Sequence, residues 1–344
     1  MDAMEVDPDI PVESIASWFD YLTLETFLGS GSFGYVFKAV SGQVNLSAVK
    51  VIFMDVNNQM QESETHQQDE ADRRRLSREY RLMKGKKHEN LVEILKSTDT
   101  PFTVEDVDVL QKIPCLQNNY DVLDDLHTYF RRAQRRTQIP TLCIQMELCG
   151  NTLRQWLNIH DESDDPKLHS VRNQIVKDMY EGLKYLHSYK IMHRDFRPEN
   201  IMFSFSLMGE DFAFPVKVGD FGQCRQIHSE QTKTKTLTPE VGNVIYRAPE
   251  ANFVNYGISA DLYSFGLVSW EVLQIIKQND TRSMFHRLVH DSRTNLVKRS
   301  YWWFRKWEHL IIRLTKRRLQ DRIKGHDEFF QAIRPDMLVS GQIF

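Results

Sequence analysis

The chain has 344 residues, of which 41 % are hydrophobic, and a formal net charge of −3. This length and apolar content can bury a substantial core in two domains, and the small negative charge gives no support to nucleic-acid binding through an overall positive field. The four cysteines show no paired metal-ligand spacing, which predicts a reducing compartment (the cytoplasm, with the nucleus as the alternative) and neither a disulfide framework nor a zinc site.

The N-terminal segment, residues 1–20, is acidic and contains prolines, so we predict that it forms a tail. It has no basic region followed by an apolar run. No segment has the roughly 18 consecutive apolar residues that a membrane span needs. We therefore expect neither secretion nor membrane contact.

A glycine-rich segment follows the first predicted strand, which begins near Tyr21. Its sequence is Gly29-Ser30-Gly31-Ser32-Phe33-Gly34-Tyr35-Val36. This Gly-x-Gly-x-x-Gly pattern also occurs at the strand-to-helix turn of dinucleotide-binding folds. Here the following residues, 36–39 and 44–49, have the apolar character of further strands, which favours a glycine-rich hairpin lying over nucleotide phosphates. A Cβ in such a hairpin would block close approach of the backbone to the phosphate oxygens.

Lys50 ends the next apolar strand, and two insertions interrupt the strands that follow. The first, at about 55–72, is polar, and a predicted helix after it carries Glu79. A short strand is expected at Leu91–Leu95. The second insertion, at about 97–140, precedes the strand Thr141–Leu148 and contains an amphipathic helix with apolar residues at helical spacing: Leu123, Leu126, Tyr129 and Phe130. It is either a regulatory or partner-binding insert or a tolerated surface excursion.

The second half of the chain carries three further motifs in order. A predicted buried helix, Val171–Tyr189, leads into His193-Arg194-Asp195-Phe196-Arg197-Pro198-Glu199-Asn200. Asp220-Phe221-Gly222 follows an apolar strand. A segment rich in Ser, Thr and Lys, residues 223–244, then precedes Tyr246-Arg247-Ala248-Pro249-Glu250.

Taken together, these motifs resemble those of the eukaryotic protein kinases, from about Tyr21 to Ala332. The resemblance implies an α+β, bilobal protein kinase fold. A small antiparallel β-sheet N-lobe with one main helix would span 21–149, including the inserts at about 55–72 and 97–140. A mostly helical C-lobe would span 150–335, and residues 336–344 would form a C-terminal tail.

The resemblance also implies roles for individual residues, with ATP and Mg²⁺ as cofactors. Asp195 would accept the proton of the substrate hydroxyl, with Arg197 beside it, and Asn200 and Asp220 would hold the metal. Lys50, paired with Glu79, would contact the ATP phosphates. The other nucleotide-binding residues would be Leu28, Gly29, Ser30, Gly31, Ser32, Phe33, Gly34, Val36, Ala48, Met146, Glu147 and Cys149.

Regulation would act through the segment before Glu250. A phosphate on Thr238, or next on Thr236, would attract Arg194 and order this segment. Asp261 resembles the residue that opens the central helix and steadies the catalytic loop, and Arg322 is expected to pair with Glu250.

Two positions depart from the usual serine/threonine kinase pattern, since Arg197 stands where Lys is usual and Asn243 where Thr is usual. Arg keeps the positive charge in a larger, planar group. The Asn243 side chain can still donate a hydrogen bond to Asp195. We expect activity to survive, at a lower rate.

Within the superfamily, residues 144–149, the long insert and residues 237–242 resemble the kinases that phosphorylate the alpha subunit of translation initiation factor 2. That subunit is then the expected protein substrate, homodimerisation is one route of regulation, and no direct nucleic-acid binding is expected. Two alternatives remain open: a catalytically weak pseudokinase acting as a binding scaffold, and a kinase with tyrosine or dual specificity.

Overall fold

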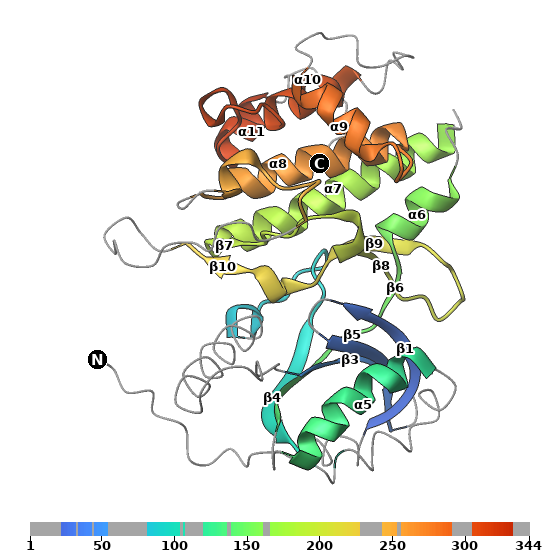
Figure 1. The fold of residues 1–344 in the computed structure, drawn as a ribbon. Coiled ribbons are helices and arrows are strands. Elements are labelled where there is room, and N and C mark those ends of the chain that lie inside the picture. Colours follow the sequence, from blue (N-terminus) through green and yellow to red (C-terminus); the bar gives the residue numbers. More distant parts are fainter. Residues whose placement is uncertain are drawn as a thin grey trace. The chain divides into compact units, whose positions relative to one another are not determined.

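The computed structural model describes residues 22–31, 34–42, 45–53, 81–103, 106, 120–135, 139–160, 166–227, 243–252, 256–290 and 305–332. The chain divides into two compact units (Figure 1). Unit 1 comprises Met1–Lys86 and Glu93–Leu148, and unit 2 comprises Lys87–Val92 and Cys149–Phe344. The predicted tails and the insert at 55–72 lie outside the described residues.

The short segment Lys87–Val92 belongs to unit 2, although the sequence placed it within the first lobe. Its backbone is bonded to a strand of unit 2: Val92 N–H donates to the carbonyl of Val218 at 2.9 Å, and Val218 N–H donates to that of Asn90 at 2.9 Å. The Asn90 side chain adds a bond to the Val216 carbonyl at 3.0 Å. These bonds tie the segment to unit 2.

Unit 1 contains a five-stranded antiparallel sheet in the order β1-β2-β3-β5-β4. Its strands are β1 Leu22–Gly31, β2 Gly34–Ser41, β3 Asn45–Phe53, β4 Ile94–Phe102 and β5 Ile139–Glu147. The glycine-rich segment joins β1 to β2, with Gly31 opposite Gly34 in the ladder. It is therefore a hairpin, as predicted, and not the strand-to-helix turn of a dinucleotide-binding fold.

The predicted limits around the second insert were wrong. The strand expected at Leu91–Leu95 runs instead from Ile94 to Phe102, and the following strand begins at Ile139, so both ends of the 97–140 insert belong to the sheet. The sequence concealed this because β4 is an edge strand, whose polar residues, such as Lys96 and Ser97, need not alternate with apolar ones.

Within the insert, the predicted amphipathic helix is present as α5, Tyr120–Arg135. It lies across one face of the sheet (Figure 1), and Val122, Leu126 and Phe130 are buried in the same apolar cluster as strand residues. The ring of Phe53 on β3 stacks on Tyr129 with centroids 4.6 Å apart. The helix is thus part of the core of unit 1, which contradicts the idea of a mere surface excursion for this part of the insert.

Shortening an apolar side chain on α5 should therefore destabilise unit 1. Val122→Ala removes two buried carbon groups and should lower the free energy of unfolding by about 1.5 kcal/mol. Asp124→Ala, on the exposed side of the same helix, is the matched control and should change it by less than about 0.5 kcal/mol. Urea denaturation followed by circular dichroism checks both. Equal stability of the two variants would mean that α5 adds nothing to the core.

Unit 2 is mostly helical, with two small sheets in the orders β6-β8-β9 and β10-β7. Its α-helices are α6 Leu153–Ile159, α7 Pro166–Ser188, α8 Ser259–Gln274, α9 Thr281–His290, α10 Arg305–Leu314 and α11 His326–Ala332. Its strands are β6 Cys149–Thr152, β7 Ile191–Met192, β8 Ile201–Ser204, β9 Ala213–Val218 and β10 Arg225–Gln226. The short 3-10 helices are η1 Pro198–Asn200, η2 Phe221–Gln223, η3 Pro249–Asn252 and η4 Leu319–Asp321.

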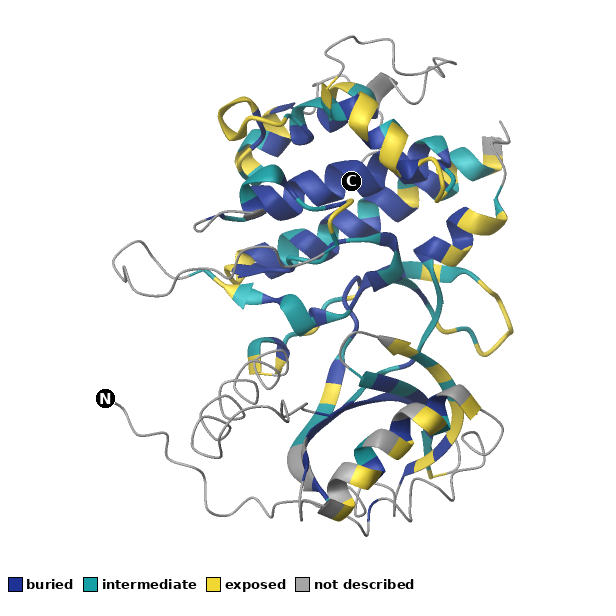
Figure 2. Ribbon diagram, in the orientation of Figure 1, coloured by how far each residue is buried: buried dark blue, intermediate teal, exposed yellow. Residues whose placement is uncertain are grey.

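Helix α8 forms the centre of unit 2. Every residue from Ser259 to Leu273 is buried, so the helix is covered on all sides (Figure 2). A helix that is apolar around its whole circumference is typical of such a position. The described residues include no helix with the length and apolar character required to cross a membrane. An antiparallel sheet in one unit and a helical second unit confirm the predicted α+β class.

Candidate active site

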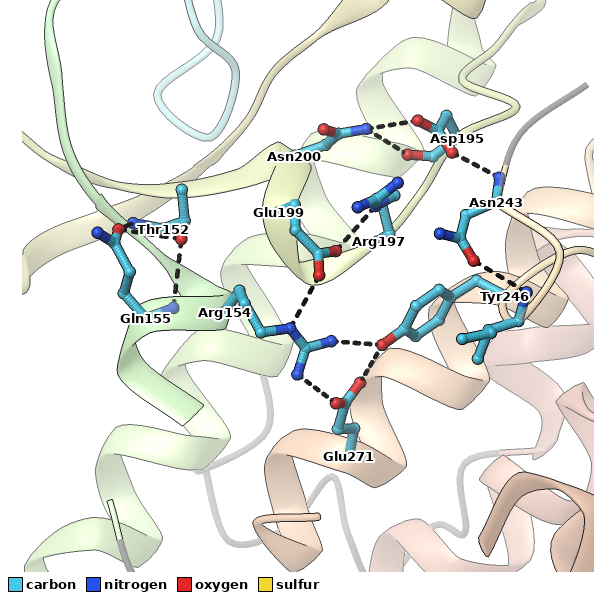
Figure 3. Close-up of polar contacts among 11 residues, drawn as sticks. Thr152, Arg154, Gln155, Asp195, Arg197, Glu199, Asn200, Asn243, Tyr246 and Glu271 are labelled. Carbon is cyan, nitrogen blue, oxygen red and sulfur yellow. Dashed lines mark hydrogen bonds and ion pairs between the residues drawn. The ribbon is translucent and has the colours of Figure 1, made fainter. Parts of the chain in front are cut away.

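The catalytic-loop motif follows β7 and ends in η1. Asp195 is held on both of its carboxylate oxygens (Figure 3). The side-chain amide of Asn200 donates to Oδ2 at 2.9 Å, and the backbone N–H of Asn243 donates to Oδ1 at 3.0 Å. The same Asn200 amide also donates to the Asp195 carbonyl at 2.8 Å. The carboxylate therefore has one fixed orientation, as a group that must aim at a reacting hydroxyl requires.

Asp261 fixes the start of this loop. Its carboxylate accepts the backbone N–H groups of His193 at 2.8 Å and Arg194 at 2.9 Å, which confirms the predicted role in steadying the catalytic loop. Arg194 has a left-handed backbone with φ of 71°, a conformation that costs energy in a non-glycine residue, and the bond to Asp261 helps to hold it there. Burial alone would raise the pKa of Asp261, but the bond to His187, the electrostatic effects of His187 and His193 and the bond from the Arg194 N–H together outweigh it and leave the pKa below the usual range.

Asn200 and Asp220 have the chemistry of a divalent metal site. The backbone N–H of Gly219, next to Asp220, donates to the Asn200 carbonyl at 2.8 Å, which ties the two motifs together. The side-chain amide nitrogen of Asn200 donates both of its hydrogen bonds to Asp195, and the side-chain oxygen of Asn200 points away from Asp195 (Figure 3). An amide oxygen and a carboxylate are hard oxygen ligands suited to a divalent ion that also binds phosphates. These residues fit such an ion.

The backbone at Asp220 is also set in an unusual conformation. Asp220 has φ of 53° and ψ of 73°, in the left-handed region. The next side chain, Phe221, is buried, and its ring meets that of His193 with centroids 6.0 Å apart. Left-handed non-glycine residues held by surrounding structure are frequent at functional sites.

Arg197 belongs to a network of charged groups beneath the loop (Figure 3). Its Nε donates to Glu199 at 2.8 Å, and the other Glu199 oxygen accepts from Arg154 Nε at 2.9 Å. Arg154 also donates to Glu271 at 2.6 Å and to the hydroxyl of Tyr246 at 2.5 Å. The Tyr246 hydroxyl in turn donates to the second Glu271 oxygen at 2.7 Å.

The pKa values of the two glutamates shift in opposite directions. Burial would raise the pKa of Glu199, but the hydrogen bonds from Arg197 and Arg154 outweigh it and the pKa is lowered. Glu271 is more deeply buried, and there burial outweighs Arg154 and Tyr246, so that its pKa is raised. The guanidinium of Arg154 therefore offsets part of the cost of burying the Glu271 carboxyl.

Sequence reasoning missed this network, although a signal existed. Helix α8 is apolar except for a few polar residues, and only Asp261 and Glu271 in it are charged. A charge inside a buried helix needs a partner. The partners Arg154 and Tyr246 are distant in sequence, so nothing local could identify them.

Asn243 contacts Asp195 in a way that differs from the prediction. The donor is the backbone N–H, whereas the side-chain oxygen of Asn243 accepts the N–H of Ile245 at 2.9 Å. Residue type at this position therefore matters less to Asp195 than we expected.

Consequently, Asn243→Ala and Asn243→Thr should both keep the contact with Asp195. We expect kcat to change by less than about fivefold in either variant, which corresponds to less than about 1 kcal/mol. Steady-state assays of phosphoryl transfer check this. A loss of more than tenfold in both variants would show that the side chain itself acts on Asp195.

In unit 1, four of the predicted nucleotide-binding residues share one face of the sheet: Val36, Ala48, Lys50 and Met146. Val36 lies opposite Lys50, and Ala48 lies opposite Met146, so their side chains project on the same side. The alternate residues, such as Val49 and Val51, belong to the cluster that α5 covers. Helix α5 therefore covers the opposite face of the sheet and not the face that carries Lys50. Lys50 itself is 7 % exposed.

Gly34 is required for a reason in addition to the predicted one. A Cβ at this position would lie 2.1 Å from the Val51 carbonyl oxygen, and the residue has φ of +145°. Its missing side chain thus allows β2 to approach β3, independently of any phosphate. At Gly29 a Cβ would meet no atom within 4 Å.

The remaining predicted residues have mixed outcomes. Leu28, Gly29, Ser30 and Gly31 lie on β1, Glu147 ends β5, and Cys149 begins β6 in unit 2. Ser32, Phe33, Glu79, Thr236 and Thr238 lie outside the described residues.

Two arginines named in the sequence analysis also have defined partners. Arg194 donates to the hydroxyl of Tyr256 at 2.7 Å. Arg322 is bonded to Glu250, which confirms that predicted pair.

Comparison with known proteins agrees with this geometry. The family model described as protein kinase domain matches residues 22–327. The chain is 32 % identical over 162 residues to eukaryotic translation initiation factor 2-alpha kinase 3 of Rattus norvegicus, a match that covers 44 % of this chain and 14 % of that protein. It is also 32 % identical over 155 residues to the interferon-induced, double-stranded RNA-activated protein kinase of Rattus norvegicus, covering 44 % and 28 %.

A longer match is found with cyclin-dependent kinase-like 1 of Caenorhabditis elegans, which is 28 % identical over 273 residues, or 78 % of this chain and 59 % of that protein. The matches thus cover less than two thirds of each relative's own length. The predicted resemblance to protein kinases, including those named for initiation factor 2-alpha, is confirmed. Because the family match covers well over half of the sequence, the chain belongs to the protein kinase domain family, whose members in general use ATP and a divalent metal.

Proposed function

We propose that the protein is a serine/threonine kinase that uses ATP and Mg²⁺ and acts on the alpha subunit of translation initiation factor 2. The observation that carries the proposal is the fixed carboxylate of Asp195, held by Asn200 and by the backbone of Asn243. The loop that carries Asp195 is also tied to the motif of Asp220, because the N–H of Gly219 donates to the Asn200 carbonyl. A carboxylate with a purely structural role would not need this second group of oxygen ligands beside it.

In this reaction Asp195 orients the substrate hydroxyl and accepts its proton. The hydroxyl oxygen forms a bond to the γ-phosphorus, and the bond between that phosphorus and the β–γ bridging oxygen breaks, which leaves ADP. The chain supplies orientation and charge, and forms no covalent intermediate.

Other residues hold the groups that carry negative charge. Arg197 is fixed through Nε by Glu199, and among the described residues its two terminal amino groups have no hydrogen-bond partner, so they suit the transferred phosphoryl group. Lys50 would contact the ATP phosphates, and Asn200 and Asp220 would hold magnesium. When bound, the ion offsets the charge of the phosphates.

The choice of substrate rests on the sequence and on relatives. Pro198-Glu199-Asn200 after Arg197 favours serine/threonine specificity over tyrosine specificity. Three relatives carry initiation factor 2-alpha in their names. These observations support that subunit over a generic protein as the substrate to test first.

The test is transfer of labelled γ-phosphate from ATP, with magnesium, to the recombinant alpha subunit and to a generic basic protein in parallel. We expect faster labelling of the alpha subunit, on serine or threonine by phosphoamino-acid analysis. Preference for the generic protein would end the substrate assignment, and label on tyrosine would end the specificity assignment. Nucleotide binding without any transfer would instead indicate a pseudokinase that acts as a scaffold.

A further inference from the structure

A chain of side-chain hydrogen bonds connects Asp261 on α8 to the start of α11. His187 Nε2 lies 2.9 Å from Asp261 Oδ2, and His187 Nδ1 lies 2.9 Å from His326 Nε2. His326 Nδ1 then lies 3.0 Å from the hydroxyl of Tyr180 on α7. Two histidines and a tyrosine thus continue the contacts of Asp261 away from the catalytic loop.

One placement of protons satisfies every bond with both rings neutral. The Asp261 carboxylate can only accept, so His187 Nε2–H donates to it. His187 Nδ1 then accepts from His326 Nε2–H, and His326 Nδ1 accepts from the Tyr180 hydroxyl. Asp261 therefore fixes which nitrogen of His187 carries the proton, and the bond from His326 to the other nitrogen fixes how the ring is turned.

The surroundings hold this chain in place. The side chains of His187 and Asp261 are 1 % and 3 % exposed. The Tyr180 ring stacks on Phe329 of α11 with centroids 4.2 Å apart, so α11 is fixed against α7 beside His326. The charged or titratable groups near this chain of bonds include Tyr180, Glu181 and Lys184 on α7, His193 after β7, Asp261 on α8 and Asp327 on α11.

We propose that His326 is a positioning residue for the catalytic loop, because it orients His187, which in turn holds the Asp261 carboxylate that binds the backbone N–H groups of His193 and Arg194. The inference rests on the proposed kinase function. It assigns to α11 a part in setting the loop that carries Asp195.

The activity test compares three variants of the full chain. His326→Leu removes the bond to His187 and should lower kcat about tenfold, with little change in the KM for ATP, since no nucleotide-binding residue is altered. His326→Gln can donate to His187 and accept from Tyr180, so it should recover most of this loss. His286→Gln, the same change at an exposed histidine on α9, is the matched control.

A second readout does not depend on activity. Burial, and then electrostatic interaction with His187 and Lys184, lower the pKa of His326 to about 4. In the unfolded chain this histidine binds a proton near pH 6.5, whereas in the folded chain it does so only near pH 4, so the free energy of unfolding falls as the pH drops through this window. His326→Gln should reduce this dependence, and His286→Gln should not.

The outcomes separate the two proposals. If the wild type transfers no phosphate, the proposed function fails, while the imidazole titration by NMR still tests the chain. The positioning role is overturned if folded His326→Leu keeps wild-type kcat, or if the Gln variant is as slow as the Leu variant. Titration of His326 near pH 6.5 in the folded protein would also contradict it. If His326→Leu does not fold, the Gln variant and the titration decide.

Discussion

Asp195→Asn should lower the turnover of phosphoryl transfer by about 10²- to 10⁴-fold, the range typical for loss of a general base. The variant cannot accept the hydroxyl proton. In addition, both oxygens of Asp195 already face N–H donors, from Asn200 and from the backbone of Asn243. The new NH₂ group must therefore face one of these donors, which turns an attraction into a repulsion.

Nucleotide binding should survive this change. Asp195 makes no contact that the proposed mechanism assigns to ATP, so kcat should fall while the KM for ATP stays close to the wild-type value. Initial rates at varied ATP, together with calorimetric binding of a non-hydrolysable analogue, check both parts. Asn243→Ala serves as the comparison, because it alters a neighbour of Asp195 and keeps its N–H donor. Wild-type turnover in Asp195→Asn would remove Asp195 from the chemistry.

The local motifs could be predicted from the sequence because the residue types within each motif determine its structure. The glycine pattern predicted a hairpin, and the motif around Asp195 and Asn200 predicted one loop that carries both side chains, which the structure shows to be hydrogen-bonded to each other. Asp261 and the Arg322–Glu250 pair were also anticipated. In these cases the residue types themselves determine the contact.

Other features depend on backbone position or on distant partners, and residue type does not reveal these. The contact between Asn243 and Asp195 uses an N–H that any residue except proline would supply. Strand β4 lies at the sheet edge, where polar residues are tolerated, so its pattern resembled a loop. The bond between His187 and His326 joins residues far apart in the sequence.

Arg154→Met should destabilise unit 2 by about 3–5 kcal/mol, the effect of removing one partner from a buried ion pair. The side chains of Arg154 and Glu271 are 8 % and 0 % exposed, and the substitution leaves the buried Glu271 carboxyl without a cation and with only Tyr246 as a donor, so that it must stay unpaired or take up a proton. Glu199 also loses one of its two arginines. The urea midpoint followed by circular dichroism measures the loss. A variant as stable as the wild type would contradict the role given to Arg154.

Two comparisons identify the orphaned charge as the cause. Lys38→Met breaks the exposed pair with Glu25 and should cost less than about 1 kcal/mol. Arg154→Met combined with Glu271→Leu removes both charges and should recover much of the stability.

The loss of stability caused by Arg154→Met alone should also depend on pH. The pKa of Glu271 is already raised by burial, and loss of Arg154 raises it further, so the folded variant keeps a proton that the unfolded chain releases. A carboxyl with a raised folded-state pKa contributes stability at low pH that disappears as the pH rises. The difference between Arg154→Met and the wild type should therefore widen from pH 5 to pH 8, and a constant difference would mean that lost packing, not the buried charge, is responsible.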